Sequence, residues 1–84
     1  MKKVVVISGG NDGLGKEIAK TLAPDYEVII LVRNKEKAKK TIKEIPCDFE
    51  ICDVRDYSQI DRALKNIYKK YKRIDCIRNL KHVL

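Results

Sequence analysis

Residues 4–15 read VVVISGGNDGLG, and this stretch decides the fold. Its first four residues are β-branched, which is typical of a strand buried on both faces of a parallel sheet. Gly9, Gly13 and Gly15 follow with the spacing G-x3-G-x-G. The stretch therefore predicts a buried strand ending at Ser8, a glycine-rich turn, and a helix that begins near Gly13.

The rest of the chain alternates between strand and helix patterns. The further strand patterns lie at residues 28–32, 49–52 and, as the beginning of a fourth strand, 74–77. The apolar stripes of helices run over residues 14–22, 38–45 and 60–71. We expect Asn34 to cap the second helix. Asp56 and Gln59 are expected to form a capping box at the start of the third.

Alternation of this kind predicts parallel strands joined by right-handed crossovers. We therefore expect an α/β fold, a partial Rossmann or doubly wound fold. Its parallel sheet should hold about four strands in the order 3-2-1-4, with helices flanking it.

Composition limits the alternatives. The 84 residues suffice for one small domain, and 37% charged with 44% hydrophobic residues fits a globular protein. No apolar run approaches the ~20 residues of a membrane span, and the start of the chain is too short for a signal peptide, so we expect a cytoplasmic protein with no membrane partner. Cys47, Cys52, Cys76 and His82 lack metal-ligand spacing. We expect no metal site, and reduced cysteines that pack as small hydrophobic residues.

The net charge of +7 admits two interpretations. One is attraction to the phosphates of a nucleic acid. The other is solvated helix faces, because acidic residues are interspersed among the lysines of residues 35–43 and 65–73 and no aromatic ladder accompanies them. We expect the second, and no nucleic-acid partner.

The glycine turn suits a phosphate group. Gly9 permits a tight turn with positive φ, Gly13 lets backbone N–H groups approach a diphosphate, and Gly15 lets the helix pack close to the strand. The diphosphate would then lie at the positive end of the helix. A glycine turn between a buried strand and an amphipathic helix indicates dinucleotide binding.

Residues 8–15, SGGNDGLG, resemble the T-G-x3-G-[IL]-G signature of the short-chain dehydrogenase/reductase family, with Ser8 in place of Thr. The family's R-N segment is matched by residues 33–34, and its D-[VL] pair by residues 53–54. Residues 74–77, IDCI, resemble the opening of its I-D-x-L-V-N-N-A-G segment, in which Asn79 also aligns. The matches extend over residues 4–79.

The resemblance implies the N-terminal, NAD(P)-binding part of an oxidoreductase. Asp53 would accept a hydrogen bond from the adenine ring. The cofactor-binding residues that the resemblance implies are Ser8, Gly9, Asn11, Gly13, Leu14, Gly15, Arg33, Asn34, Asp53, Val54 and Asn79.

The residues after the second strand bear on the choice of cofactor. Val32 stands where NAD-preferring relatives carry Asp, and Arg33 follows it. An uncharged residue followed by Arg favours the 2′-phosphate of NADP. Asp12, where many NADP-dependent relatives carry a basic residue, opposes this. We expect a modest preference for NADP, with NAD as the alternative and a solvated strand-end charge as the other interpretation of Arg33.

The family's chemistry uses Ser, Tyr and Lys residues that lie after the fourth strand. Tyr68 and Lys72 form a Y-x3-K match, but they lie before that strand, in the third helix. We expect Tyr68 to be a core residue and Lys72 a surface residue, so this chain is expected to hold no catalytic residue.

The family pattern stops after Ile77. Arg78 would bring a charge into a central strand, where its burial would be costly. We therefore divide the chain into residues 1–77, the N-terminal part of an NAD(P)-binding domain, and residues 78–84, a divergent tail. One hypothesis is a reductase fragment, ended by a frameshift or early stop and inactive alone, whose fourth strand leaves an edge open to self-association. The alternatives are a standalone nucleotide-binding module with a regulatory or scaffold role and, third, a basic nucleic-acid-binding protein.

Overall fold

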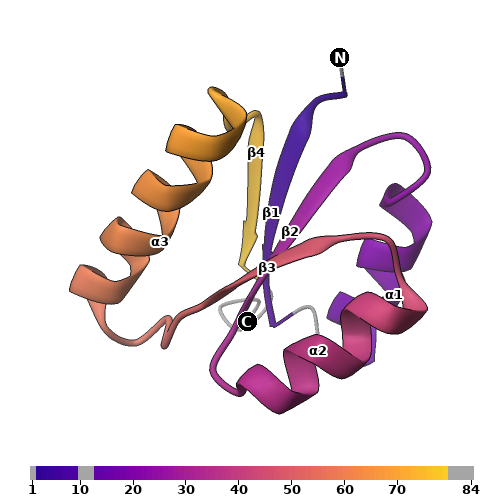
Figure 1. Ribbon diagram of the computed structural model, residues 1–84, viewed down its shortest axis with the longest axis horizontal. Helices are drawn as coiled ribbons and strands as arrows, with labels where there is room; N and C mark the ends of the chain where they lie inside the picture. Colours follow the sequence, from indigo (N-terminus) through magenta and orange to yellow (C-terminus); the bar gives the residue numbers. More distant parts are fainter. Residues whose placement is uncertain (1, 10–12, 80–84) are drawn as a thin grey trace.

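The computed structural model describes residues 2–9 and 13–79, with only the backbone of Asn79. The strands are β1 (Val4–Ser8), β2 (Glu27–Val32), β3 (Asp48–Ile51) and β4 (Cys76–Asn79). The helices are α1 (Gly13–Leu22), α2 (Lys35–Glu44) and α3 (Tyr57–Tyr71). All strand pairs are parallel, and the order is β3-β2-β1-β4 (Figure 1). The expected α/β fold and strand order 3-2-1-4 are confirmed.

The sheet lies between two helical layers, with α1 and α2 on one face and α3 on the other (Figure 1). Alternate residues of β1 point to opposite faces. Val5 and Ile7 join the core beneath α1 and α2, whereas Val4 and Val6 join the core beneath α3. This explains why the β-branched run is continuous, because each residue of it is buried on one face or the other.

The fourth strand differs from its prediction. It begins at Cys76, two residues later than expected, and Ile74 instead packs into the core beneath α3. Arg78 lies within the strand and is exposed. The cost expected from burying the charge of Arg78 therefore does not arise. In the described part of the chain β4 is at the edge of the sheet, where a charged side chain reaches water.

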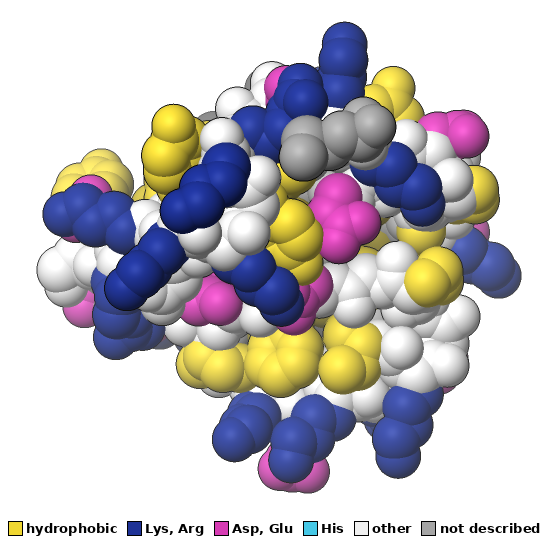
Figure 2. Space-filling view, turned by 45° about the horizontal axis from the view of Figure 1, so that its top comes forward, with side chains coloured by type: hydrophobic (Ala, Val, Ile, Leu, Met, Phe, Trp, Pro, Cys, Tyr) yellow, Lys and Arg dark blue, Asp and Glu magenta, His cyan; other side chains and the backbone are white. Residues whose placement is uncertain are grey.

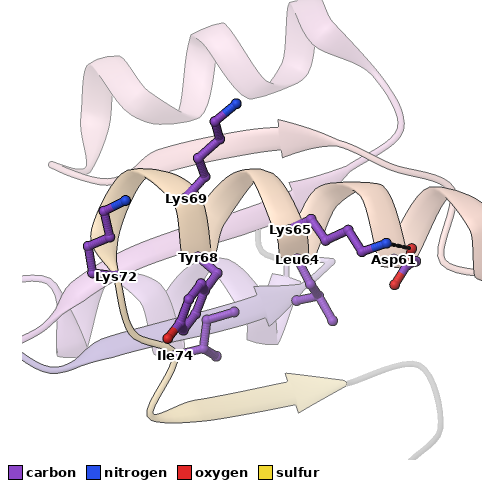
Figure 3. Close-up of a pocket in the computed structure, with 7 residues that line it drawn as sticks. All are labelled: Asp61, Leu64, Lys65, Tyr68, Lys69, Lys72 and Ile74. Carbon is purple, nitrogen blue, oxygen red and sulfur yellow. Dashed lines mark ion pairs between the residues drawn. The ribbon is translucent and has the colours of Figure 1, made fainter.

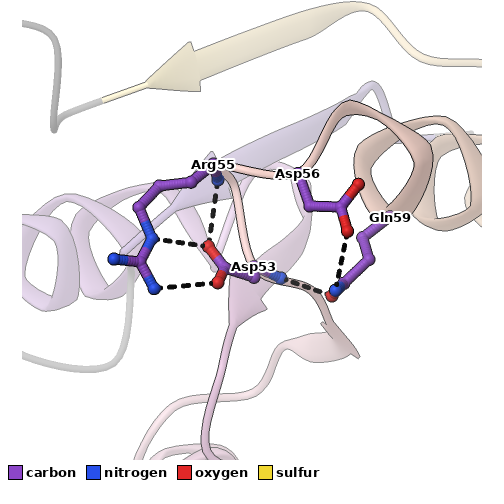
Figure 4. Close-up of polar contacts among 4 residues, drawn as sticks. All are labelled: Asp53, Arg55, Asp56 and Gln59. Carbon is purple, nitrogen blue, oxygen red and sulfur yellow. Dashed lines mark hydrogen bonds and ion pairs between the residues drawn. The ribbon is translucent and has the colours of Figure 1, made fainter.

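The helix starts are confirmed in part. The Asn34 side chain accepts a hydrogen bond from Lys37 N–H at 3.0 Å, so the cap of α2 is as predicted. Asp56 caps α3 by accepting from Ser58 N–H at 3.0 Å. Gln59 does not complete a capping box, because its Oε1 accepts from the N–H of Asp53 at 2.9 Å (Figure 4).

Tyr68 is not the core residue that we expected. The buried residues of α3 are Ala63 and Ile67, which face the sheet. Tyr68, one position further around the helix, is 58% exposed. Its ring lies beside Ile74 in a shallow hollow of about 480 Å³ with a largely cationic rim, shown in Figure 3.

The surface carries both signs of charge. Figure 2 shows lysine and arginine side chains with carboxylates between them. The ion pairs Lys65–Asp61 and Lys16–Glu44 join neighbouring surface positions. None of the helices described is long and apolar enough to cross a membrane.

Candidate functional site

The carboxyl ends of parallel strands meet at one edge of the sheet, and ligands of open α/β sheets bind there. Ser8 ends β1 and pairs with Leu31 of β2 on one side and with Asn79 of β4 on the other. Val32 ends β2 and pairs with Ile51 of β3. The residues that follow these strand ends are therefore brought together at this edge, which is also where α1 begins.

The glycine turn begins directly after β1. Gly9 has φ 75°, the positive value that the sequence predicts for it, and its N–H donates to the carbonyl of Leu31 at 3.1 Å. Gly13, the first residue of α1, also has a positive φ of 54°. Among the described residues, a Cβ added at Gly13 would meet nothing within 4 Å. Open space therefore adjoins the first turn of α1, whose N–H groups have no partner within the helix.

The other predicted residues of the turn occupy different environments. Ser8 is 2% exposed, and Gly15 is a buried residue of α1 itself. Leu14, expected to begin the apolar stripe of the helix, is 69% exposed and lies outside the core. Asn11 lies outside the described residues, as does Asp12, which was expected to oppose a 2′-phosphate.

The two predicted residues after β2 differ in their contacts. Arg33 is exposed at the strand end. The Asn34 side-chain oxygen is engaged in capping α2. Across the strand pair, Cys52 N–H donates to the carbonyl of Val32 at 2.8 Å. This hydrogen bond continues the register of Val32 with Ile51, so Arg33 is level with Cys52 and Asp53 follows one residue later.

Asp53 is held by a residue that the sequence analysis did not identify. Arg55 Nε donates to Asp53 Oδ1 at 3.1 Å and its second guanidinium nitrogen to Oδ2 at 3.0 Å, while Arg55 N–H also donates to Oδ1 at 3.0 Å (Figure 4). These hydrogen bonds, with the charge of Arg55, lower the pKa of Asp53 to about 2. The D-x-R spacing, typical of an Asx turn, is the signal that could have found it.

The neighbours of Asp53 are structural. Its N–H donates to Gln59, and Val54 packs against the core beneath α3. The backbone of this loop is therefore fixed to the sheet and to α3, while the carboxylate of Asp53 remains 27% exposed.

The Y-x3-K match lies at the amino ends of the strands, opposite the carboxyl ends where the glycine turn lies. It occupies the last turn of α3, where Lys70 and Tyr71 both donate to Asp48 Oδ2 at 2.7 Å. Asp48 is the first residue of β3, so this contact marks the amino ends of the strands. Tyr68 and Lys72 are therefore separated from the glycine turn by the length of the strands.

The three cysteines pack within the hydrophobic cores. Cys47, Cys52 and Cys76 are free, and all three belong to the two cores, as expected of small hydrophobic residues. Among residues 2–9 and 13–79 there is no group of three or more His, Cys, Asp or Glu that could hold a metal ion.

Comparison with known proteins gives a consistent set of relatives. A family model described as short chain dehydrogenase matches residues 3–80. Carbonyl reductase family member 4 of Xenopus laevis is 37% identical over 81 residues, which cover 94% of this chain and 34% of that protein. The chain thus spans about a third of the length of such relatives.

Solved structures give the same result. A short chain dehydrogenase from Bacillus anthracis superposes with a TM-score of 0.85 at 34% identity, covering 89% of this chain and 34% of that one. A 3-ketoacyl-(acyl-carrier-protein) reductase from Brucella melitensis, solved in complex with NADH, gives a TM-score of 0.82 at 27% identity. The latter match covers 89% of this chain and 32% of that structure.

Proposed function

The chain belongs to the short-chain dehydrogenase family, and from this premise we propose that it binds the adenosine and diphosphate half of NAD(P), with a modest preference for NADP. The observation that carries the proposal is the convergence of three features at one sheet edge. These are the glycine turn at Gly9 and Gly13, the exposed Arg33, and the ionised Asp53.

The chemistry of these groups fits a dinucleotide. The N–H groups of the first turn of α1, which have no partner within the helix, begin at Gly13 and suit the diphosphate. Asp53 is a hydrogen-bond acceptor at neutral pH and suits the amino group of adenine. The remaining residues of the proposed site would shape these two contacts. They are Ser8, Asn11, Leu14, Gly15, Asn34, Val54 and Asn79.

The preference for NADP is supported by the exposed guanidinium of Arg33, which can donate to a 2′-phosphate. NAD is the competing cofactor, because the structure of the Brucella melitensis reductase holds NADH. The two cofactors differ at the ribose 2′ position, so Arg33 is the residue on which the choice is proposed to depend.

When bound, NAD(P) supplies a hydride acceptor or donor, and the residues of this chain would hold and orient its adenosine half. We propose that residues 1–77 form this binding unit, residues 78–84 a divergent tail, and that the catalytic Ser, Tyr and Lys of the family are not among the 84 residues. The chain would then be inactive by itself as an oxidoreductase. A standalone nucleotide-binding module is the alternative.

Calorimetric titration of the 84-residue protein with NADPH and with NADH tests the proposal. We expect both to bind, NADPH the more tightly, and each to raise the unfolding temperature as it saturates the site. If neither cofactor binds, the proposed function is contradicted. Tighter binding of NADH would overturn only the preference.

Partners and compartment are proposed on the same basis. We propose a dinucleotide ligand, no nucleic-acid partner, and a reducing compartment such as the cytoplasm, which suits three free cysteines. The outer edge of β4 pairs with no strand in the described residues and is the surface proposed for self-association. Salt-sensitive retention on DNA with no effect of cofactor would instead favour the nucleic-acid hypothesis.

A further inference from the structure

We propose that Arg55 is a specificity-determining residue that changes partner, leaving the carboxylate of Asp53 for the 2′-phosphate of NADP and freeing that carboxylate for the adenine amino group. This inference rests on the proposed function, because it requires a dinucleotide at this edge of the sheet. It adds a second arginine, from the neighbouring strand end, to Arg33.

The first step of the argument is that one partner is fixed and the other is not. The backbone of Asp53 is anchored by its N–H, which donates to Gln59, and by the adjacent hydrogen bond from Cys52 to Val32. The Arg55 side chain, by contrast, is 75% exposed. Within the described residues its guanidinium donates two hydrogen bonds, both to Asp53. The guanidinium can therefore turn about its own side-chain bonds without disturbing the loop.

The second step concerns the acceptor capacity of Asp53. A carboxylate has about four lone-pair positions. Arg55 fills three of them, two through its guanidinium and one through its backbone N–H. An adenine amino group must therefore use the one remaining lone-pair position of the Asp53 carboxylate or displace the guanidinium. If the guanidinium leaves, the backbone N–H of Arg55 still orients the carboxylate, and one whole side of it becomes free.

The third step is that a phosphate can take the guanidinium. The Arg55 side chain is 75% exposed, so water and salt screen its contact with Asp53, and the exchange replaces one bidentate anionic partner by another. The planar fork that grips a carboxylate also fits a phosphate in the same bidentate manner. A phosphate carries more negative charge than a carboxylate, which favours the exchange.

The fourth step is the charge of the surroundings. Val32 pairs with Ile51, so Arg33 follows the end of β2 level with Cys52, the residue before Asp53, and the charge of Arg33 contributes to lowering the pKa of Asp53. Two arginines thus surround one carboxylate. The excess positive charge suits an additional anion here, and NADP brings one that NAD lacks.

The exchange predicts that loss of Arg55 weakens the binding of NADPH but not that of NADH. Arg55→Ala removes a ligand of the 2′-phosphate, so NADPH should bind about tenfold more weakly, in the range of one charge-assisted hydrogen bond. The same substitution frees Asp53 for adenine, so NADH should bind as tightly as before or more tightly. Arg55→Lys keeps the charge but loses the fork, and should fall between Arg55→Ala and the unchanged protein for NADPH.

Arg62→Ala is the matched control. Arg62 is also exposed, and it donates to the carbonyl of Ile51 at the end of β3 rather than to Asp53. Its removal changes the net charge by the same amount at the same edge. Arg62→Ala should lower the affinity for both cofactors by the same small factor and leave the ratio of the two affinities unchanged.

Calorimetric titration of the four proteins with NADPH and NADH decides the matter, with thermal unfolding to establish that each is folded. A fall in the ratio of NADPH to NADH affinity in Arg55→Ala, with the ratio retained in Arg62→Ala, supports the exchange. Equal weakening of both cofactors, or no change in the ratio, overturns it while dinucleotide binding stands. If the unchanged protein binds neither cofactor, the proposed function fails and the exchange with it. Should Arg55→Ala not fold, Arg55→Lys carries the same test.

Discussion

The carboxylate of Asp75 accepts a hydrogen bond from the backbone N–H of Val4 at 2.7 Å, although 71 residues separate the two in the chain. The backbone adds a second contact, from Asp75 N–H to the carbonyl of Val4 at 2.9 Å. Arg73 in turn donates twice to the same carboxylate, at 2.7 Å each. Because Val4 begins β1 and Cys76 begins β4, this contact sets the register in which the last strand joins the sheet.

We expect Asp75→Ala to loosen β4 more than Asp75→Asn. Asn keeps an oxygen that can accept from Val4 N–H, whereas Ala leaves that part-buried donor without the carboxylate. Amide hydrogen exchange should show faster exchange in β4 for Asp75→Ala, and its unfolding temperature should be lower by several degrees. Asp61→Ala, which removes only an exposed ion pair with Lys65, is the control and should change neither. Equal effects of Ala and Asn would show that the hydrogen bond does not hold the strand.

Two adjacent residues of α3 should respond very differently to truncation. Ile67 is 2% exposed and lies in the core against the sheet, so Ile67→Val should lower the free energy of unfolding by about 0.5–1.5 kcal/mol and Ile67→Ala by about 2–5 kcal/mol. Tyr68→Ala, in the shallow hollow, should change it by less than about 1 kcal/mol. Urea denaturation measures both. A larger loss in Tyr68→Ala than in Ile67→Val would mean that something covers the hollow in solution.

There is room for a side chain at Gly13, but the backbone conformation of this residue disfavours one. No atom of residues 2–9 and 13–79 lies within 4 Å of an added Cβ, but φ is 54°, which L residues adopt at a cost. Gly13→Ala should therefore destabilise the protein by about 1 kcal/mol, and Gly13→Asn by less, because Asn adopts this conformation more readily. Urea denaturation ranks the variants. If Ala is as stable as Gly, the turn does not need a positive φ at this residue.

Acid should destabilise the protein partly through Asp48. Burial opposes its ionisation, but hydrogen bonds from Lys70, Tyr71 and Phe49 N–H outweigh it and hold the pKa of the carboxyl below 3.8. Because the pKa is lowered on folding, this contribution is complete above the ordinary value and is lost as the pH falls through the folded value. Asp48→Asn should be less stable at pH 7 and lose less on acidification. A parallel decline of both proteins in urea midpoints measured below pH 4 would contradict this.

Cys47 should react slowly with alkylating reagents in the native protein. Burial raises the pKa of its thiol from 9.0 to about 11, which reduces the thiolate fraction about 100-fold at neutral pH. Iodoacetamide labelling, read by peptide mass spectrometry, should be correspondingly slow at pH 7.5. Labelling in urea provides the unfolded reference. Equal rates in the two conditions would show that this thiol is not protected by the fold.

Local patterns were sufficient for most of the fold. The continuous β-branched run of residues 4–7 predicted a strand buried on both faces, and the cap at Asn34 followed from one side chain and its own backbone. Gly9 has the positive φ expected of it. A prediction failed where a side chain had more than one possible partner. The capping box requires the Gln59 side chain to accept from Asp56 N–H, but it accepts from Asp53 N–H and donates to the Asp56 carboxylate.

The candidate site was likewise predicted in part from the sequence and in part revealed only by the tertiary structure. The sequence by itself determined the glycine turn and the positions of Arg33 and Asp53, because each follows directly from a strand pattern of short range. Only the tertiary structure decided what surrounds them: the hydrogen bonds from Arg55 to Asp53 and the exposure of Tyr68, Leu14 and Arg78. The physical reason is that hydrophobic spacing fixes which side of an element faces inward. Which neighbours cover each face, and which partner a charged side chain chooses, depends on segments far apart in the chain.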